Sequence, residues 1–262
     1  MEKVFGKHSV RAALMARPGS VRRMILAGKE SYHRDFIELA RRAGIEPELL
    51  SWPEFLRDGD FNEDDKHQGI AIFTDPRPVL TEGDLDQLAD AHIVVALDQI
   101  SDPQNLGTIL RTAAFFRADA VLLLKNRAAE VTPLVVRVAV GGAEFVSVFR
   151  VTNLARSLGI LKELGFWVYG LDERGENTLA ETQFDRKAVL VVGAEGEGLR
   201  RRTKETCDVL VRIPGGRPGV ESLNAGVAAS IAIYELFRTE LPAGAARDGP
   251  SLSSCGDFAD CE

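Results

Sequence analysis

The sequence predicts an α/β protein built around a mostly parallel sheet, and two patterns after residue 92 lead to this expectation. Short, continuous apolar runs with many β-branched residues are typical of strands buried on both faces. Helix-like segments separate these runs, and one of them begins at Asn153 and is stopped by Gly165. Strands that alternate with helices favour parallel pairing. The predicted strands span residues 93–97, 120–124, 145–151, 166–171, 188–193 and 209–213.

The chain has 262 residues, which is enough for two domains. Within residues 1–75, short helical patterns alternate with strand-like runs, so we expect a small α/β domain there. Pro76 and Pro78 favour an extended linker over residues 76–91. A second domain then covers residues 92–241, and its last helix spans about 221–239. Residues 242–262, which are rich in Gly, Ala, Ser and Asp, predict a disordered tail.

The formal net charge of -7 argues against a protein that coats nucleic acid over its whole surface. Charge is uneven, however. Residues 1–42 carry ten Lys and Arg residues against four acidic residues, a net charge of +6. Two interpretations stay open: these cations lie on ordinary solvated helix faces, or they form one basic face that contacts phosphate groups.

Other features argue against several classes of protein. No apolar run reaches the ~18 residues of a membrane span, and residues 1–10 do not resemble a signal peptide, so we expect a cytoplasmic protein without a membrane partner. Three cysteines cannot all pair within the chain, and none forms a CxxC motif. The four histidines lie outside the segments described next, so we expect neither a metal site nor a Ser-His-Asp mechanism.

A first polar segment follows the predicted strand at 93–97. The polar turn at 98–105 leads into a helix that begins near Leu106, and such a turn at the carboxyl end of a strand is a natural ligand site. From spacing alone, Asn105 could equally be an ordinary helix N-cap and Arg111 an ordinary surface arginine.

A second polar segment follows the strand at 188–193. Gly193, Gly196 and Gly198 would let the backbone approach a ligand closely, but their spacing is not the dinucleotide-binding fingerprint. Glu195 and Glu197 in the same loop favour a neutral or cationic ligand over a pyrophosphate. The arginines at 200–202 either start a solvated helix or contact a polyanion.

A third segment follows the strand at 209–213. It contains a glycine-rich turn and then a helix made almost wholly of small or apolar residues, which permit very close packing. This helix is either an ordinary buried element or one that packs against the ligand loop or a second subunit. Residue patterns alone therefore predict a two-domain α/β protein in which three loops converge on one small ligand.

The three segments in this order resemble the three motifs of the SpoU (TrmH) family of RNA 2'-O-ribose methyltransferases, in the SPOUT superfamily. The segments read DPQNLGTILRTA, VVGAEGEGL, and IPGG followed by SLNAGVAASI. Residues 150–172 are similar to the corresponding stretch of bacterial members that modify a guanosine of large-subunit (23S) ribosomal RNA. Residues 5–14 resemble part of the family's RNA substrate-binding domain. The resemblance covers about residues 3–240.

The resemblance implies a SpoU-type methyltransferase domain over 92–241 whose parallel sheet ends in a trefoil knot, a homodimer, and S-adenosylmethionine as the methyl donor. By motif match, the residues implied in catalysis are Asn105, Arg111, Glu195 and Asn224, and those implied in cofactor binding are Gly193, Ile213, Ser222 and Leu223. Two departures affect the third motif: its loop has one extra residue around Arg217 and Pro218, and Gly226 stands where a serine is frequent.

The implied reaction transfers a methyl group from a sulfonium to a ribose hydroxyl. Because the sulfonium loses its charge in the transition state, Glu195 is interpreted as a residue that fixes the loop or orients the cofactor. The family proposal makes Arg111 a base. A guanidinium is almost always protonated, so a clamp on the flanking phosphate is the competing role. The alternatives to 23S rRNA methylation are a ribose methyltransferase for tRNA and a non-catalytic RNA-binding protein in ribosome assembly.

Overall fold

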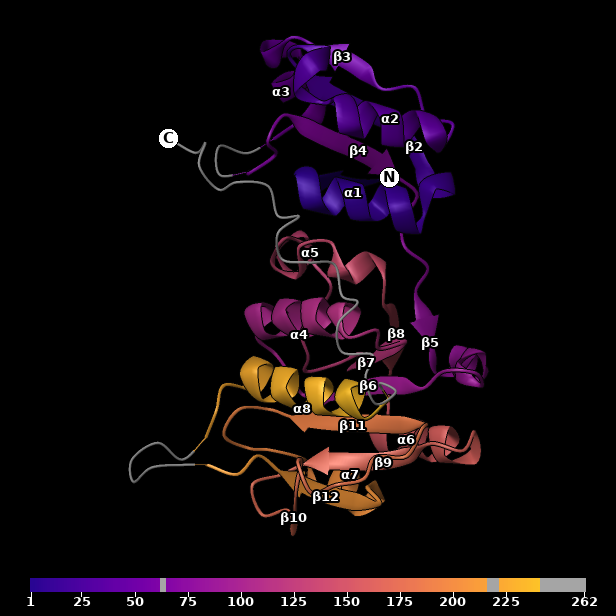
Figure 1. Ribbon diagram of the computed structural model, residues 1–262, viewed down its shortest axis with the longest axis vertical. Helices are drawn as coiled ribbons and strands as arrows, with labels where there is room; N and C mark the ends of the chain where they lie inside the picture. Colours follow the sequence, from indigo (N-terminus) through magenta and orange to yellow (C-terminus); the bar gives the residue numbers. More distant parts are fainter. Residues whose placement is uncertain (62–64, 216–221, 241–262) are drawn as a thin grey trace.

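The computed structural model describes residues 1–61, 65–215 and 222–240, and its strands form two separate sheets (Figure 1). The first sheet has four strands in the order β1-β4-β2-β3, and the second has eight in the order β10-β12-β9-β11-β6-β7-β8-β5. The predicted disordered tail at 242–262 and the altered loop around Arg217 lie outside the described residues.

The first unit contains the strands that lie before residue 75. Strand β4 pairs antiparallel with both β1 and β2, and β3 pairs parallel with β2. Buried apolar residues of α1 and α2 pack on one side of this sheet, and Phe55 of α3 is buried on the other. The elements are β1 (Glu2–Phe5), α1 (Lys7–Ala16), η1 (Pro18–Ser20), β2 (Val21–Ala27), η2 (Glu30–Tyr32), α2 (Arg34–Arg42), β3 (Glu48–Leu50), α3 (Trp52–Gly59) and β4 (Ile70–Thr74).

The second unit contains the parallel sheet that the apolar runs predict, and every neighbouring pair of its strands is parallel. All six predicted strands are present, within two residues of the expected bounds. The α/β class with a parallel sheet is therefore confirmed. The strands are β5 (Leu80–Thr81), β6 (Ile93–Asp98), β7 (Ala120–Leu124), β8 (Ser147–Val151), β9 (Trp167–Leu171), β10 (Asn177–Thr178), β11 (Ala188–Gly193) and β12 (Val209–Arg212).

Helices cover both faces of this sheet, because alternate residues of its central strands point to opposite sides. On one face, Val95 of β6 belongs to the apolar core shared with α4, α5 and α8; on the other, Val94 belongs to the core shared with η3 and α6. The remaining elements are η3 (Glu82–Leu88), α4 (Pro103–Phe115), α5 (Pro133–Ala139), η4 (Gly142–Glu144), α6 (Leu154–Glu163), α7 (Arg201–Thr206) and α8 (Ala225–Glu240).

The strand order changes direction between β6 and β11. From β6 the chain builds β7 and β8 on one side, and then returns to build β9, β11 and β12 on the other. In open α/β sheets a ligand binds outside the carboxyl ends of the strands at such a switch point. The first and second motif loops follow β6 and β11, so both leave the sheet there.

The linker is shorter than the sequence predicts. Within the expected linker at 76–91, β5 pairs with β8, and η3 buries Leu85 and Leu88 against the second sheet. Because acidic and polar residues surround these two leucines in the sequence, the segment has the composition of a linker. Among the helices that the structure describes, none is long and apolar enough to cross a membrane.

Candidate functional site

Helix α4 begins at the first motif, and Asp102 rather than Asn105 caps it. The Asp102 carboxylate accepts hydrogen bonds from the backbone N–H groups of Gln104 (3.0 Å) and Asn105 (3.3 Å). Asn105 therefore lies inside the first helical turn, where it is 8% exposed. Since its amide is not used as the cap, it can contact another element.

The glycine loop after β11 folds back on itself. A Cβ at Gly193 would lie 2.2 Å from the carbonyl carbon of Gly198, so no larger residue fits without moving the backbone. Gly196 and Gly198 adopt φ angles of 83° and 67°, which glycine reaches without steric cost. Ala194 and Gly198 form an antiparallel bridge, which leaves Glu195 exposed at the tip of the loop.

Asn224 joins the second and third motifs. Its side-chain oxygen accepts hydrogen bonds from the backbone N–H groups of Gly226 (3.0 Å) and Val227 (3.2 Å), so it caps α8. Its Nδ2 donates to a carboxylate oxygen of Glu195 at 3.4 Å. A Cβ at Gly226 would lie 3.1 Å from Oδ1 of Asn105. The structure thus brings Asn105, Glu195 and Asn224 together, and Gly226 lets α8 approach Asn105 this closely.

A buried carboxylate, which sequence reasoning did not select, ties the glycine loop to the first motif. Asp98 ends β6, and its side chain has no exposed surface. It accepts hydrogen bonds from the Arg200 backbone N–H (2.9 Å) and from Nε of Arg200 (2.6 Å). The signal was an acidic residue directly after five apolar strand residues, where a charge needs a partner.

The sequence leaves two roles open for the arginines at 200–202: they start a solvated helix, or they contact a polyanion. Their partners in the structure show which of them is available for such a contact. Arg200 is held by Asp98, and Arg201 lies 3.6 Å from Glu205 on the exposed side of α7. Arg202 has no side-chain hydrogen bond or ion pair within the described residues. Among the residues that the structure describes, Arg202 is therefore the one of the three that can meet a polyanion without losing an existing partner.

Arg111 lies on α4 six positions after Asn105, about 9 Å farther along the helix axis. Its side chain is exposed and has no hydrogen bond or ion pair with any residue that the structure describes. The structure does not gather Arg111 into the cluster of Asn105, Glu195 and Asn224. With no partner among the described residues, its guanidinium can contact a group outside the chain.

The remaining motif residues lie at the second and third loops. Ile213 is half-buried against the core, Gly193 is half-buried at the base of its loop, and Leu223 is 44% exposed just before α8. Ser222 is exposed as well. The segment 216–221 between them lies outside the described residues, so the structure places only the two ends of this loop.

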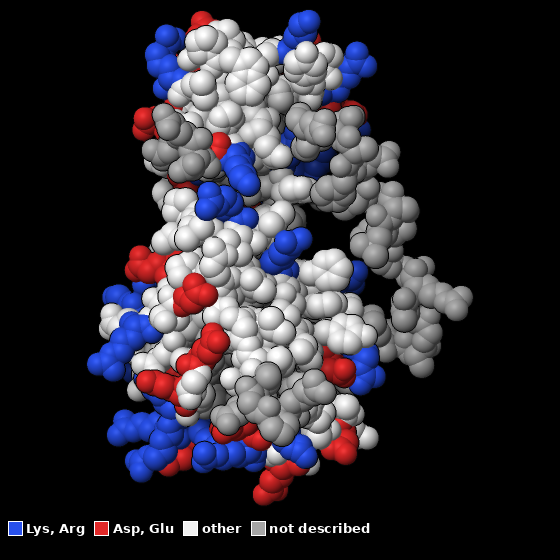
Figure 2. Space-filling model, turned by 90° about the vertical axis from the view of Figure 1, so that its left-hand side faces the viewer, with Lys and Arg blue, Asp and Glu red and all other residues white. Residues whose placement is uncertain are grey.

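Strands β9 and β11 point to the left-hand side of Figure 1, and Figure 2 views the molecule from that side. Charged residues of both signs gather over its lower part, and a broad uncharged area lies above them (Figure 2). The face toward which the strands run therefore has no single sign of charge.

Most of the cations in the basic stretch at 1–42 are held by other groups of the folded chain. Seven of its ten cations have partners in the folded chain; for example, Arg23 contacts both Glu48 (2.5 Å) and Asp58 (2.9 Å). Three exposed cations have no side-chain partner among the described residues: Lys7, Lys29 and Arg34. The other seven cations, each with an ion pair or a side-chain hydrogen bond, are Lys3, Arg11, Arg17, Arg22, Arg23, Arg41 and Arg42.

Other reactive groups do not join the site. Burial raises the pKa of Cys207 to about 12, so its thiol stays protonated and is a poor nucleophile. Within the described residues, no group of three or more His, Cys, Asp or Glu side chains could hold a metal ion. Among the described residues, the motif side chains at the site are the amides of Asn105 and Asn224, the carboxylate of Glu195 and, farther along α4, the guanidinium of Arg111.

A parallel sheet with two motif loops at its switch point defines an α/β protein that binds a ligand at the carboxyl ends of its strands. The chain belongs to the SpoU rRNA Methylase family, whose model matches residues 92–234. It is 35% identical over 245 residues to the 23S rRNA (guanosine-2'-O-)-methyltransferase RlmB of Pseudomonas aeruginosa, covering 92% of this chain and 98% of that one. It is 36% identical over 250 residues to RlmB of Coxiella burnetii, covering 93% and 98%.

Solved structures share the fold. The SpoU methyltransferase AviRb from Streptomyces viridochromogenes, in complex with AdoMet, matches with a TM-score of 0.69 and 24% identity over 90% of this chain and 89% of that one. An AdoMet-bound rRNA methyltransferase from Sinorhizobium meliloti matches with a TM-score of 0.70 and 22% identity over 92% and 88%. Both likenesses extend across the two units of this chain.

Proposed function

We propose that the protein is an S-adenosylmethionine-dependent enzyme that methylates the ribose 2'-hydroxyl of a guanosine in 23S ribosomal RNA. The observation that carries the proposal is the match of at least 35% identity to 23S rRNA (guanosine-2'-O-)-methyltransferases over nearly their whole length. The match includes the first unit as well as the methylase region, so it is not limited to the shared catalytic fold.

The residues at the switch point suit S-adenosylmethionine. The tight loop at 193–198 exposes backbone at the carboxyl end of β11, and the exposed Leu223 offers an apolar surface for an adenine ring. Gly193, Ile213, Ser222 and Leu223 are the residues proposed to hold the cofactor. When bound, it supplies an electrophilic methyl group on a sulfonium.

The polar cluster has a positioning role in this proposal. Asn224 holds Glu195 in place through its amide while it caps α8, and Asn105 packs beside Gly226. These contacts set the relative positions of the three motifs before any ligand arrives. Because the motifs are already positioned, the entropy cost of ordering these loops does not add to the barrier of the reaction step.

Arg111 has one of two roles toward the RNA. As a clamp, its guanidinium would bind the phosphate beside the target ribose and hold the hydroxyl in line with the methyl group. As a base, it would remove the hydroxyl proton, which requires a strongly perturbed guanidinium. Its free, exposed side chain supports contact with RNA in either case.

The fold of the proposed enzyme includes a trefoil knot in the C-terminal part of the sheet, and the molecule works as a homodimer in the cytoplasm. Helix α8 supports the dimer because it exposes an apolar stripe at helical spacing: Val227 (46%), Ile231 (37%) and Tyr234 (45%). Phe115 at the end of the neighbouring α4 is 73% exposed. Residues 1–75 supply RNA affinity in this proposal.

Two measurements test the function. Ribose methylations would be mapped in total RNA with and without the gene, and the loss of one 23S guanosine methylation is expected. Isothermal titration of the purified protein with S-adenosylmethionine separates an enzyme from a non-catalytic RNA-binding protein. Loss of a tRNA methylation instead, or no cofactor binding, would contradict the proposal.

A further inference from the structure

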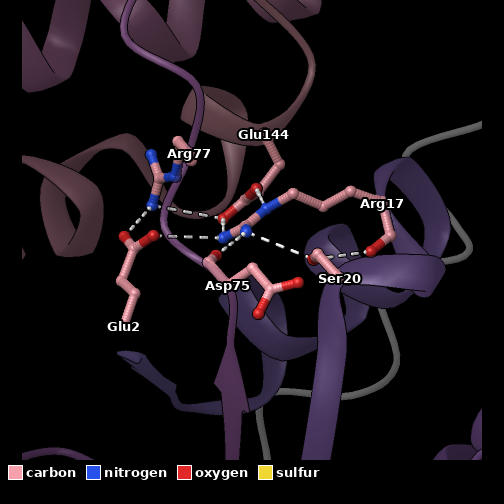
Figure 3. Close-up of polar contacts among 6 residues, drawn as sticks. All are labelled: Glu2, Arg17, Ser20, Asp75, Arg77 and Glu144. Carbon is pink, nitrogen blue, oxygen red and sulfur yellow. Dashed lines mark hydrogen bonds and ion pairs between the residues drawn. The ribbon is translucent and has the colours of Figure 1, made fainter.

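A buried carboxylate lies at the junction of the two units. Glu144 ends η4 in the second unit, and its side chain has no exposed surface. Arg17, which follows α1 in the first unit, donates from Nε to one Glu144 oxygen at 2.6 Å and from Nη2 to the other at 3.5 Å (Figure 3). This two-bond geometry fixes both the distance and the orientation of the two units at this point.

Two more charges complete the junction. Nη2 of Arg77, in the short linker, lies 2.8 Å from one carboxylate oxygen of Glu2 and 3.3 Å from Glu144 (Figure 3). Arg17 also donates to the carbonyl oxygen of Asp75 at 2.8 Å. The other two guanidinium nitrogens of Arg77 are buried without a hydrogen bond in the described part of the chain. Arg17 is therefore the principal partner of Glu144.

The turn that carries Glu144 is packed tightly on two sides. Toward the first unit, a Cβ at Gly141 would lie 2.6 Å from Cβ of Ala12. Toward the second unit, a Cβ at Gly142 would lie 2.8 Å from Cα of Arg111. Consecutive glycines thus bring α1 against one side of η4 and the backbone of Arg111 against the other.

We propose that Glu144 is a positioning residue: through η4 it transmits the placement of the first unit to Arg111. The inference rests on the proposed function, because it takes Arg111 to act on the RNA that the first unit holds. Arg17 and Arg77, whose side chains are mostly buried, share two carboxylates, Glu144 and Glu2. Removing the Glu144 charge leaves Glu2 of the first unit as their one shared carboxylate among the described residues, so the link to the second unit loosens. The backbone of α4 then loses its support at Arg111, although no ligand contact has been removed.

The kinetic test compares Glu144→Gln with Glu130→Gln in the full-length protein. Glu130 makes an exposed ion pair with Arg150 at 3.0 Å, so its variant is a matched control. For Glu144→Gln we expect single-turnover methyl transfer to fall about 10- to 100-fold, because small misplacement of a reacting group has this cost. The Kd for S-adenosylmethionine and the KM for rRNA stay within about twofold. Arg17→Lys, which keeps the charge, should retain an intermediate rate.

A second measurement does not depend on methyl transfer. Hydrogen exchange of backbone amides should become faster across η4 and residues 107–115 in Glu144→Gln, and stay unchanged in α6. Gly142→Ala should have the same effect, whereas Gly159→Ala should not, since a Cβ at Gly159 meets no atom within 4 Å. Circular dichroism at the assay temperature verifies that each variant is folded. If Glu144→Gln does not fold, Arg17→Lys and Gly142→Ala test the positioning role in its place.

Failure of the inference and failure of the proposed function give different results. If the wild-type protein methylates no rRNA, the proposed function is wrong, and hydrogen exchange still decides whether Glu144 supports α4. If the wild type is active but Glu144→Gln keeps both its rate and its exchange at 107–115, the positioning role is overturned. A rate loss that appears only as a higher KM would also overturn it, because the first unit would then act in RNA binding alone.

Discussion

The fully buried carboxylate of Asp98 accepts two hydrogen bonds from Arg200, one from its backbone N–H at 2.9 Å and one from its side chain at 2.6 Å. Asp98 ends β6, and Arg200 follows the glycine loop of the second motif. The pair therefore closes the loop at 193–199 from its far end, as the pairing of Gly193 with Asp98 closes it at the base.

We predict that Arg200→Ala weakens both folding and cofactor binding, because it leaves the Asp98 carboxylate buried with one hydrogen-bond donor fewer. The free energy of unfolding should fall by about 1–3 kcal/mol. Arg201→Ala is the control, since Arg201 is 85% exposed, and its effect should stay within about 0.5 kcal/mol. Chemical denaturation and titration with S-adenosylmethionine check both effects. Equal behaviour of the two variants would show that the Asp98 pair does not hold the loop.

Asn224 should show two separable effects. Asn224→Ala removes the cap of α8, which costs about 1 kcal/mol, and also removes the donor to Glu195. Asn224→Ser keeps a capping oxygen but cannot reach Glu195 as an amide does. We therefore expect Ser to restore the melting temperature and not the affinity for S-adenosylmethionine. Recovery of both by Ser would mean that the amide acts only as a cap.

The fold was predictable where a pattern is local. The apolar runs that became β6 and β11 are long and uninterrupted, and Asn153 caps α6 as expected through a bond to the Arg156 backbone at 3.2 Å. Strands β1 and β3, with four and three residues, carry too few positions for a pattern, and they become strands only by pairing.

The site was predictable in its loops but not in its contacts. Motif resemblance selected Asn105, Glu195 and Asn224, which the structure brings together. It could not select Asp98 or Glu144, because their partners lie 102 residues away at Arg200 and 127 residues away at Arg17. Spacing along the chain says nothing of such pairs. The knot is equally invisible to local patterns, and it stays a proposal.

Substitutions of Arg111 should change the rate of methyl transfer and leave the affinity for the cofactor unchanged. Arg111→Ala removes an exposed side chain that has no partner in the described part of the chain, so S-adenosylmethionine should bind almost unchanged while single-turnover transfer falls strongly. Arg111→Lys separates the two roles. If Arg111 clamps a phosphate, the Arg111→Lys variant should keep partial activity, because lysine keeps the charge. If Arg111 is the base, the pH–rate profile of this variant should shift to lower pH, because lysine loses its proton more easily. Loss of cofactor binding in Arg111→Ala would show that Arg111 lies beside the cofactor and not, as proposed, beside the RNA.

The dimer should depend on the exposed stripe of α8. Ile231→Glu places a charge in this stripe, and we expect sedimentation to show a shift from dimer to monomer together with loss of methyl transfer. Leu56→Glu is a matched control, because Leu56 is 46% exposed on α3, in the first unit. A wild-type protein that is monomeric and still methylates rRNA would contradict the proposal that the enzyme works as a homodimer.

The last prediction concerns which cations bind RNA. Lys7, Lys29 and Arg34 have no partner among the described residues, so they can meet phosphates without breaking an ion pair. Changing all three to Gln should lower RNA affinity and reduce the slope of log affinity against log salt by about 2 to 3.

The matched control changes Arg22, Arg41 and Arg42 to Gln, which alters the net charge by the same amount. Each of these arginines already pairs with a carboxylate on the surface. If they stay paired in the complex, the control changes the salt slope by much less than the first triple variant. Fluorescence anisotropy with a labelled rRNA fragment at several salt concentrations measures both. Equal slopes for the two variants would mean that RNA affinity follows net charge, and that the three unpaired cations do not mark the contact surface.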